Sequence, residues 1–131
     1  LKNPQNNIPL LLQANQNHRK AFEYKIAWFL LNKNVEEAVK QIKEMKEMGY
    51  NQIPRHLEEA ALAYLNSTGN LPDLGGLSIQ PKTRIRFSQY VSTYKRVRQD
   101  PSLDIQSIRN QFNNSFWFYF HFKETNSDSN N

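Results

Sequence analysis

The residues of this sequence best able to do chemistry are its histidines, its clustered cations and two adjacent glutamates. His18, His56 and His121 stand far apart along the chain. A zinc site needs several ligands at short spacing, such as two histidines one helical turn apart, and the sequence holds no such pair. The chain also has no cysteine, which excludes disulfides and thiolate ligands. We therefore expect no bound metal and no cofactor.

Arg55 and His56 are candidate binding residues at the start of a predicted helix. They follow Pro54, whose fixed φ suits the first helical turn. Cations in that turn oppose the helix dipole, and a residue placed against local preference sometimes marks a site. One interpretation is that Arg55 and the free amides of this helix start hold an anion or a carboxylate. The other is that Arg55 pairs with Glu58 or Glu59, or with an acid of the preceding helix.

Glu58 and Glu59 form a poor pair of catalytic acids. Adjacent residues point about 100° apart on a helix, so their carboxylates do not converge on one substrate atom. Serine-nucleophile motifs, glycine-rich phosphate loops and Rossmann signatures are absent from the sequence. We therefore name no catalytic residue and expect a chain that is not an enzyme.

The strongest charge feature is the segment 82–98, which contains lysines and arginines but no acid. In a chain with a net charge of +5, this composition is typical of a helix that contacts nucleic acid. On a helix Arg84, Lys95 and Arg98 share one side, whereas the other cations of the segment scatter. Its tyrosines fall on the apolar stripe, as core residues would. The segment is therefore either a binding surface for nucleic acid, another polyanion or anionic lipid headgroups, or a solvated flank.

The segment 115–122, SFWFYFHF, is almost entirely aromatic. Its residues suit a strand as well as a helix, but a lone strand after several helices would have no partner. We expect a short helix that caps the molecule. Because so short a helix cannot bury all its rings against one neighbour, there are two interpretations. Either some rings are exposed to a partner, with Trp117 and Tyr119 as the candidates, or the rings simply cap the helical stack.

Helical periodicity dominates the rest of the chain. Residues 21–31 read AFEYKIAWFLL, which is apolar nearly all round a helix and predicts cover from more than one side. After them, apolar residues recur at spacings of three and four, and glycines mark helix ends. The expected helices run from Asn17 to Asn32, from Asn34 to Gly49, from Pro54 to near Gly69, from Pro81 to Gln99 and through Ile105 to Phe112, with an ordered loop over 70–80.

These elements predict an all-α fold of five or six antiparallel helices in a tetratricopeptide-like right-handed stack. Short links favour antiparallel neighbours. A shift of 34 residues aligns Ala27 with Ala61 and Leu31 with Leu65, and this is the period of tetratricopeptide helix pairs. We divide the chain into a partly ordered lead-in over 1–14, a single domain over 15–123 and a disordered tail over 124–131.

The AFEY start, the LLNKN turn, the GY-x-x-IPRH-x-EEA link and the late aromatic block together resemble a Bacteroidetes family, DUF6057. The resemblance covers about residues 15–123 and is most specific over GY…IPRH. It implies that the chain is the soluble, tetratricopeptide-like C-terminal tail of a larger protein, membrane-associated through a multi-pass region upstream. No activity is established for the family, so the resemblance assigns no functional residue.

Short helical stacks present a concave face that binds extended or helical peptides. The sequence therefore predicts a non-catalytic protein-interaction module. Its partner would be an unknown protein or peptide, or the membrane region of the same chain. Binding of nucleic acid or another polyanion through 82–98 is the alternative. The candidate contact residues are Tyr50, Arg55, His56, Arg84, Lys95, Arg98, Trp117 and Tyr119.

Overall fold

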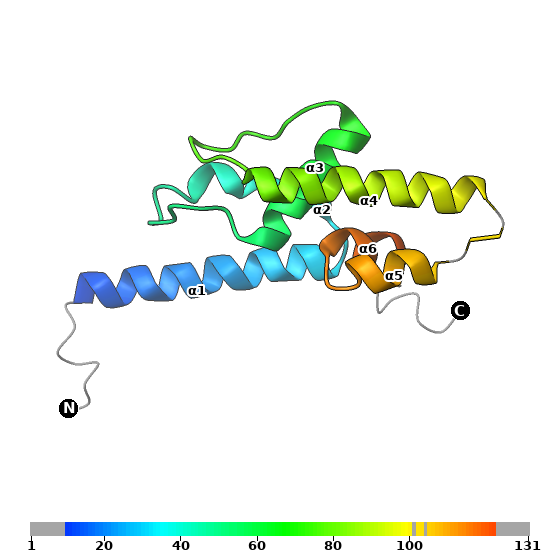
Figure 1. Ribbon diagram of the computed structural model, residues 1–131. Coiled ribbons are helices and arrows are strands. Elements are labelled where there is room, and N and C mark those ends of the chain that lie inside the picture. Colours follow the sequence, from blue (N-terminus) through cyan, green and yellow to red (C-terminus); the bar gives the residue numbers. More distant parts are fainter. Residues whose placement is uncertain (1–9, 101, 104, 123–131) are drawn as a thin grey trace.

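The computed structural model describes residues 10–100, 102–103 and 105–122, and this part of the chain is entirely helical, without a strand. The all-α prediction is therefore confirmed. The expected tail over 124–131 and most of the expected lead-in lie outside the described residues. The elements, shown in Figure 1, are α1 (Leu10–Leu31), α2 (Val35–Lys40), the short 3-10 helix η2 (Ile42–Glu44), α3 (Arg55–Thr68), α4 (Pro81–Gln99), α5 (Gln106–Phe112) and α6 (Phe116–Phe122).

The other helices pack around α3. It contacts α2, α4 and α6, and it lies steeply inclined to α1 and α4, which both run from left to right in Figure 1. The six consecutive residues 57–62 are all buried, and they extend more than once round the helix. Therefore α3, and not the first helix, is the element enclosed on several sides.

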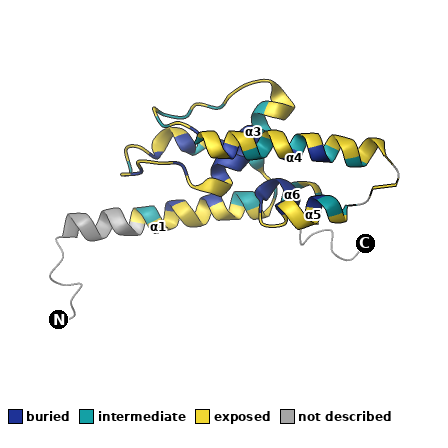
Figure 2. Cartoon of the chain, in the orientation of Figure 1, coloured by how far each residue is buried: buried dark blue, intermediate teal, exposed yellow. Residues whose placement is uncertain are grey.

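The prediction that residues 21–31 are enclosed is wrong. Phe22 and Ile26 are buried, but Tyr24, Trp28 and Leu31 are 69%, 59% and 60% exposed. Figure 2 shows this yellow outer face along α1, whose main contact is with α2. The helix also begins at Leu10, well before the cap expected at Asn17, because the leucines and alanine that precede Asn17 favour a helix and extend it.

Asn34 ends one helix and begins the next. Its N–H donates to Phe29 O at 2.8 Å, and the Lys33 N–H donates to Leu30 O at 3.1 Å, in the pattern that closes a helix around a left-handed residue. Lys33 is this left-handed residue, with φ of 60°. The Asn34 side chain then accepts from the Glu37 N–H at 3.3 Å, as the predicted helix cap should.

The second predicted helix is shorter than expected, since α2 ends at Lys40 and tight turns follow it to Gly49. The Gln41 N–H bonds Ala38 O, and the Gln41 side chain donates to Glu37 O at 3.0 Å, which satisfies the carbonyl that the tighter turn releases. A Cβ on Gly75 would lie 2.6 Å from Lys43 O. The backbone of the 70–80 loop thus packs directly on the segment after α2.

The aromatic block forms a helix, as expected, but its rings are covered better than expected. Phe116, Trp117 and Phe118 are buried, Tyr119, Phe120 and Phe122 are half-buried, and His121 is exposed. The Trp117 ring centroid lies 5.1 Å from that of Phe87 and 5.6 Å from that of Tyr90, both on α4. Because α6 packs against α3, α4 and α5 rather than against one neighbour, even this short helix buries most of its aromatic surface.

Candidate functional site

A buried carboxylate on α3 fixes the start of α4. Glu58 is 1% exposed. One of its carboxylate oxygens accepts from the Gln80 N–H at 2.8 Å, and the other accepts from the Thr83 hydroxyl at 2.7 Å. Gln80 is the N-cap residue of α4 and provides no side-chain cap of its own. The negative charge therefore lies where the helix dipole favours it, and it locks α4 onto α3.

The next residue does the same for α6. The Glu59 carboxylate, also buried, accepts from the Phe116 N–H at 2.8 Å, and its backbone carbonyl accepts from Trp117 Nε1 at 2.8 Å. Its oxygens also lie 3.0 Å from His56 Nδ1 and 3.6 Å from Arg55 Nε. The pairing of Arg55 with Glu59 confirms the second interpretation of the Pro54-Arg55 start. Arg55 also donates to Asn114 O at 3.1 Å, in the turn before α6, and both Arg55 and His56 remain half-exposed.

Two other candidate contact residues prove to be core residues. Tyr50 is 8% exposed, and its hydroxyl bonds the Glu23 carboxylate beneath the guanidinium of Arg19, 4.1 Å from the ring centroid. Burial, together with the Glu23 hydrogen bond, raises the pKa of Tyr50. Trp117 has no exposed surface. The prediction of surface contacts is therefore wrong for both, whereas Tyr119 is half-buried and its hydroxyl bonds Leu31 O.

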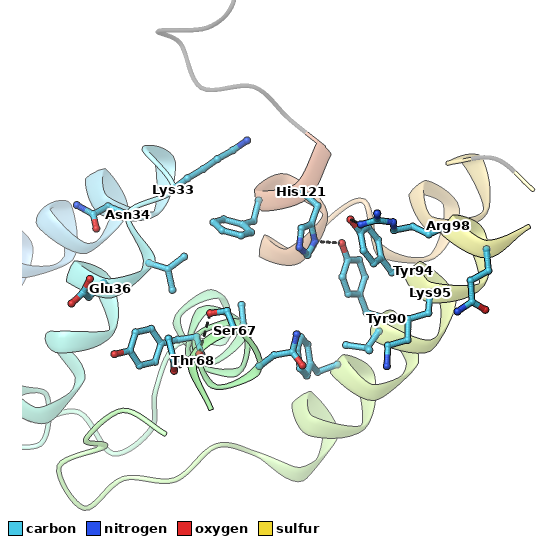
Figure 3. A pocket seen from close by; sticks show the side chains of 18 residues that line it. Lys33, Asn34, Glu36, Ser67, Thr68, Tyr90, Tyr94, Lys95, Arg98 and His121 are labelled. Carbon is cyan, nitrogen blue, oxygen red and sulfur yellow. Dashed lines mark hydrogen bonds between the residues drawn. The ribbon is translucent and has the colours of Figure 1, made fainter. Parts of the chain in front are cut away.

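A groove of about 860 Å³ lies between the C-terminal half of α3, α4, α6 and the start of α2 (Figure 3). Two of the predicted contact residues, Lys95 and Arg98, line the groove. Arg84 does not line it and lies about 16 Å before Lys95 along the axis of α4. Its apolar lining comes from four elements and consists of Val35, Ala63, Tyr64, Phe87, Val91 and Phe120.

One side of the groove is a stack of rings. The His121 imidazole lies beside the neighbouring rings of Tyr94 and Tyr90, at 4.9 Å and 5.6 Å between centroids, and the two tyrosine rings are 6.0 Å apart. His121 Nδ1 hydrogen-bonds the Tyr90 hydroxyl, which also donates to Trp117 O at 3.2 Å. Burial raises the pKa of Tyr90, and burial, aided by the charge of Lys33, lowers the pKa of His121. Both groups are therefore neutral at neutral pH, and the stack is a packed wall rather than a poised acid–base pair.

Positive charge lies at the rim. Lys95 and Arg98 stand at one side, and Lys33 stands at the other (Figure 3). The acid that lines the groove, Glu36, lies 3.7 Å from Lys40 Nζ and is partly neutralised by it. Within the described part of the chain, neither Lys95 nor Arg98 forms an ion pair. A ligand in the groove therefore meets net positive potential.

The basic segment 82–98 does not act as one surface. Arg86 donates to Gln111 O at 3.2 Å and lies over the Phe112 ring at 5.1 Å, so it fastens α5 to α4. Arg84 is exposed on a part of α4 outside the groove. The sequence placed Arg84 on the same side of the helix as Lys95 and Arg98, but the groove is lined by α4 residues from Phe87 to Gln99 and does not include Arg84.

The stability of the fold should fall on acidification partly because of His121. The folded protein holds the pKa of this histidine below its ordinary value of 6.5, so the unfolded chain binds the proton first. This contribution to stability is complete above pH 6.5 and is lost as the pH falls from 6.5 toward the pKa of His121 in the folded protein. Urea unfolding between pH 7.5 and about 5 should therefore show a smaller loss of stability for His121→Phe than for the wild type.

The exposed His18 supplies the control for that measurement. His18→Asn, at a position that packs against no ring of the groove, should keep the wild-type pH dependence. An identical dependence in the wild type and His121→Phe would contradict the assignment.

The described residues include no group of three or more His, Asp or Glu side chains able to hold a metal ion. Among the described helices, none has both the length and the apolar character needed to cross a membrane.

Comparison with known proteins identifies the family of the chain. Residues 1–123 match DUF6057, a family of unknown function, and the chain therefore belongs to this family. No curated protein and no solved structure matches it.

Proposed function

We propose that this member of DUF6057 is a non-catalytic protein-interaction module that binds a partner through the groove between α3, α4 and α6. The observation that carries the proposal is the groove itself, about 860 Å³ in volume. Tyr64, Phe87 and Val91 line it and remain half-exposed there, although each also packs on the core. An apolar hollow with a polar rim is the common form of a binding site, because its desolvation favours a complementary partner.

The order of helix contacts supports a repeat-like stack. Each of α1, α2, α3 and α4 packs on the next helix along the chain, which is the arrangement of solenoid proteins. We propose that the stack is tetratricopeptide-like, right-handed and built of antiparallel neighbours, with the groove on its binding face. The shortened α2 is the main departure from equal helix pairs.

We also propose that the chain is the soluble tail of a larger membrane protein. The proposal rests on the sequence resemblance, which implies a membrane region upstream. The partner in the groove would then be another protein at that membrane or the membrane region of the same chain. Fractionation of native cells tests this: antigen that stays with membranes after a high-salt wash supports the proposal, and antigen that is soluble or washes off contradicts it.

Selection from a random peptide library tests the groove directly. We expect peptides that bind the whole chain and lose about tenfold or more in affinity when Ala63 and Val91 are both replaced by Gln, because polar side chains then occupy the apolar lining. Ile85→Gln is the matched control, since Ile85 is on α4, is 60% exposed and lies outside the groove. Failure to select any peptide that depends on Ala63 and Val91 would refute the proposal.

Binding of a polyanion through 82–98 remains the alternative function. It has less support, because Arg86 is engaged with α5 and Arg84 lies outside the groove that Lys95 and Arg98 line. A non-specific polyanion site would show a steep loss of affinity with salt and would need Arg84 as much as Lys95 and Arg98.

A further inference from the structure

The cations that line the groove are placed to meet a ligand together. Lys95 and Arg98 are one turn apart on α4, and Lys33 lies across the groove on the link between α1 and α2 (Figure 3). The Arg98 guanidinium lies 5.7 Å from the centroid of the Tyr94 ring, and its Nη1 is 3.4 Å from the Tyr94 hydroxyl. This contact holds Arg98 beside the aromatic wall, so an anion that binds it also lies against apolar surface.

Between these charges the groove offers apolar contact. Tyr64 on α3, Val91 on α4 and Phe120 on α6 are all half-buried and line the same hollow. Asn66, which is on α3 like Tyr64, also lines the hollow, and its side chain has no hydrogen-bond partner among the described residues. It is therefore free to bond the main chain of a bound segment.

The ring stack argues against nucleic acid as the occupant. Single-stranded nucleic acid binds by stacking its bases on open aromatic faces along a positively charged path. Here His121 stacks on both Tyr90 and Tyr94, and Arg98 covers Tyr94 as well. The exposed cation Arg84 lies outside the groove. The faces of Tyr90 and Tyr94 are therefore partly taken by protein groups, and the cations of the groove do not continue into a longer basic path through Arg84.

We infer that the occupant of the groove is an acidic protein segment with apolar anchors. Its aliphatic or aromatic side chains pack on Val91 and Phe120, and an Asp or Glu carboxylate pairs with Lys95 and Arg98. The inference rests on the proposed function and specifies the chemistry of the partner. Charge complementarity selects acidic segments, while the apolar lining excludes segments that are acidic alone.

The test extends the peptide selection to charge. Peptides selected on the whole wild-type chain should combine Asp or Glu with large apolar residues. The binding of a synthesised selected peptide, followed by fluorescence anisotropy, should weaken by about tenfold or more in Lys95→Glu/Arg98→Glu. The control is Lys82→Glu/Arg84→Glu, which makes the same charge change on α4 outside the groove and should leave the affinity within about twofold. Selection on Lys95→Glu/Arg98→Glu should yield basic peptides instead.

The outcomes separate this inference from the proposed function. Peptides that need Ala63 and Val91 but lack acids, or that survive Lys95→Glu/Arg98→Glu, would overturn the acidic partner and leave the groove as a binding site. A selection that yields no groove-dependent peptide would overturn both. Binding of heparin that weakens equally in Lys82→Glu/Arg84→Glu and Lys95→Glu/Arg98→Glu, without any effect of Ala63→Gln/Val91→Gln, would replace the inference with the polyanion alternative.

Discussion

Replacement of Glu59 by alanine should lower the free energy of unfolding by about 2–4 kcal/mol. Its buried carboxylate accepts from the Phe116 N–H and contacts His56 and Arg55, so alanine leaves a buried donor unpaired at the start of α6 and a void beside it. The Arg55 and His56 side chains are half-exposed and regain water, which keeps the loss below that of a fully buried ion pair. Urea unfolding followed by circular dichroism measures the change.

Glu36→Ala is the matched control, because the Glu36 side chain is 65% exposed and pairs only at the surface. It should change stability by no more than about 0.5 kcal/mol. A Glu59→Ala variant as stable as Glu36→Ala would contradict the assigned role. Hydrogen exchange sharpens the test: Glu59→Gln should loosen the first amides of α6, whereas Glu58→Gln should loosen those at Gln80 and the start of α4.

Helix ends with local signals were predictable from the sequence. Pro81 opens α4, Gly69 with φ of 79° closes α3, and Asn34 caps α2, as expected. Each signal acts through a hydrogen bond or a backbone angle within a few residues, so the sequence alone contains the information. The early start of α1 and the early end of α2 were missed, because no strong stop or start signal marks either place.

The buried glutamates could not be predicted from local pattern. Glu58 bonds a residue 22 positions away, and Glu59 bonds one 57 positions away. Helical periodicity places charged residues on the solvent face, whereas here two adjacent charges face two different helix starts. The available signal was indirect. Gln80 is a weak cap for α4, and the free N–H groups of a helix start without a local cap need a hydrogen-bond acceptor from elsewhere in the chain.

The enclosure of a helix also depends on how many neighbours it has, which its own sequence does not give. The apolar residues 21–31 are open on one face, while α3, with its two glutamates, is surrounded. Of the predicted contact residues, Lys95 and Arg98 line the groove and Trp117 is buried, whereas the groove residues Tyr64, Val91 and His121 were not among the predicted contacts. Half-burial on an apolar stripe is the only signal for the missed residues, and periodicity cannot distinguish it from full burial.

Trp117→Ala should be the most destabilising single substitution, with a loss of about 3–5 kcal/mol in the free energy of unfolding. The side chain is fully buried against Phe87 and Tyr90, and its Nε1–H bonds Glu59 O at 2.8 Å. Trp117→Phe should cost about 1–3 kcal/mol, since it keeps most of the ring contacts but loses the buried hydrogen bond from Nε1–H to Glu59 O.

The chain has one other tryptophan, Trp28, which is 59% exposed and serves as the control. Trp28→Ala should cost less than about 1 kcal/mol. In a Trp28→Phe background, Trp117 becomes the single indole reporter, and its emission should shift to longer wavelength on unfolding in urea because the ring passes from a dry site to water. If Trp117→Ala cost no more than Trp28→Ala, α6 would not be enclosed as described. The groove wall that α6 supplies through Phe120 and His121 would then lack its support, and the binding proposal would fail with it.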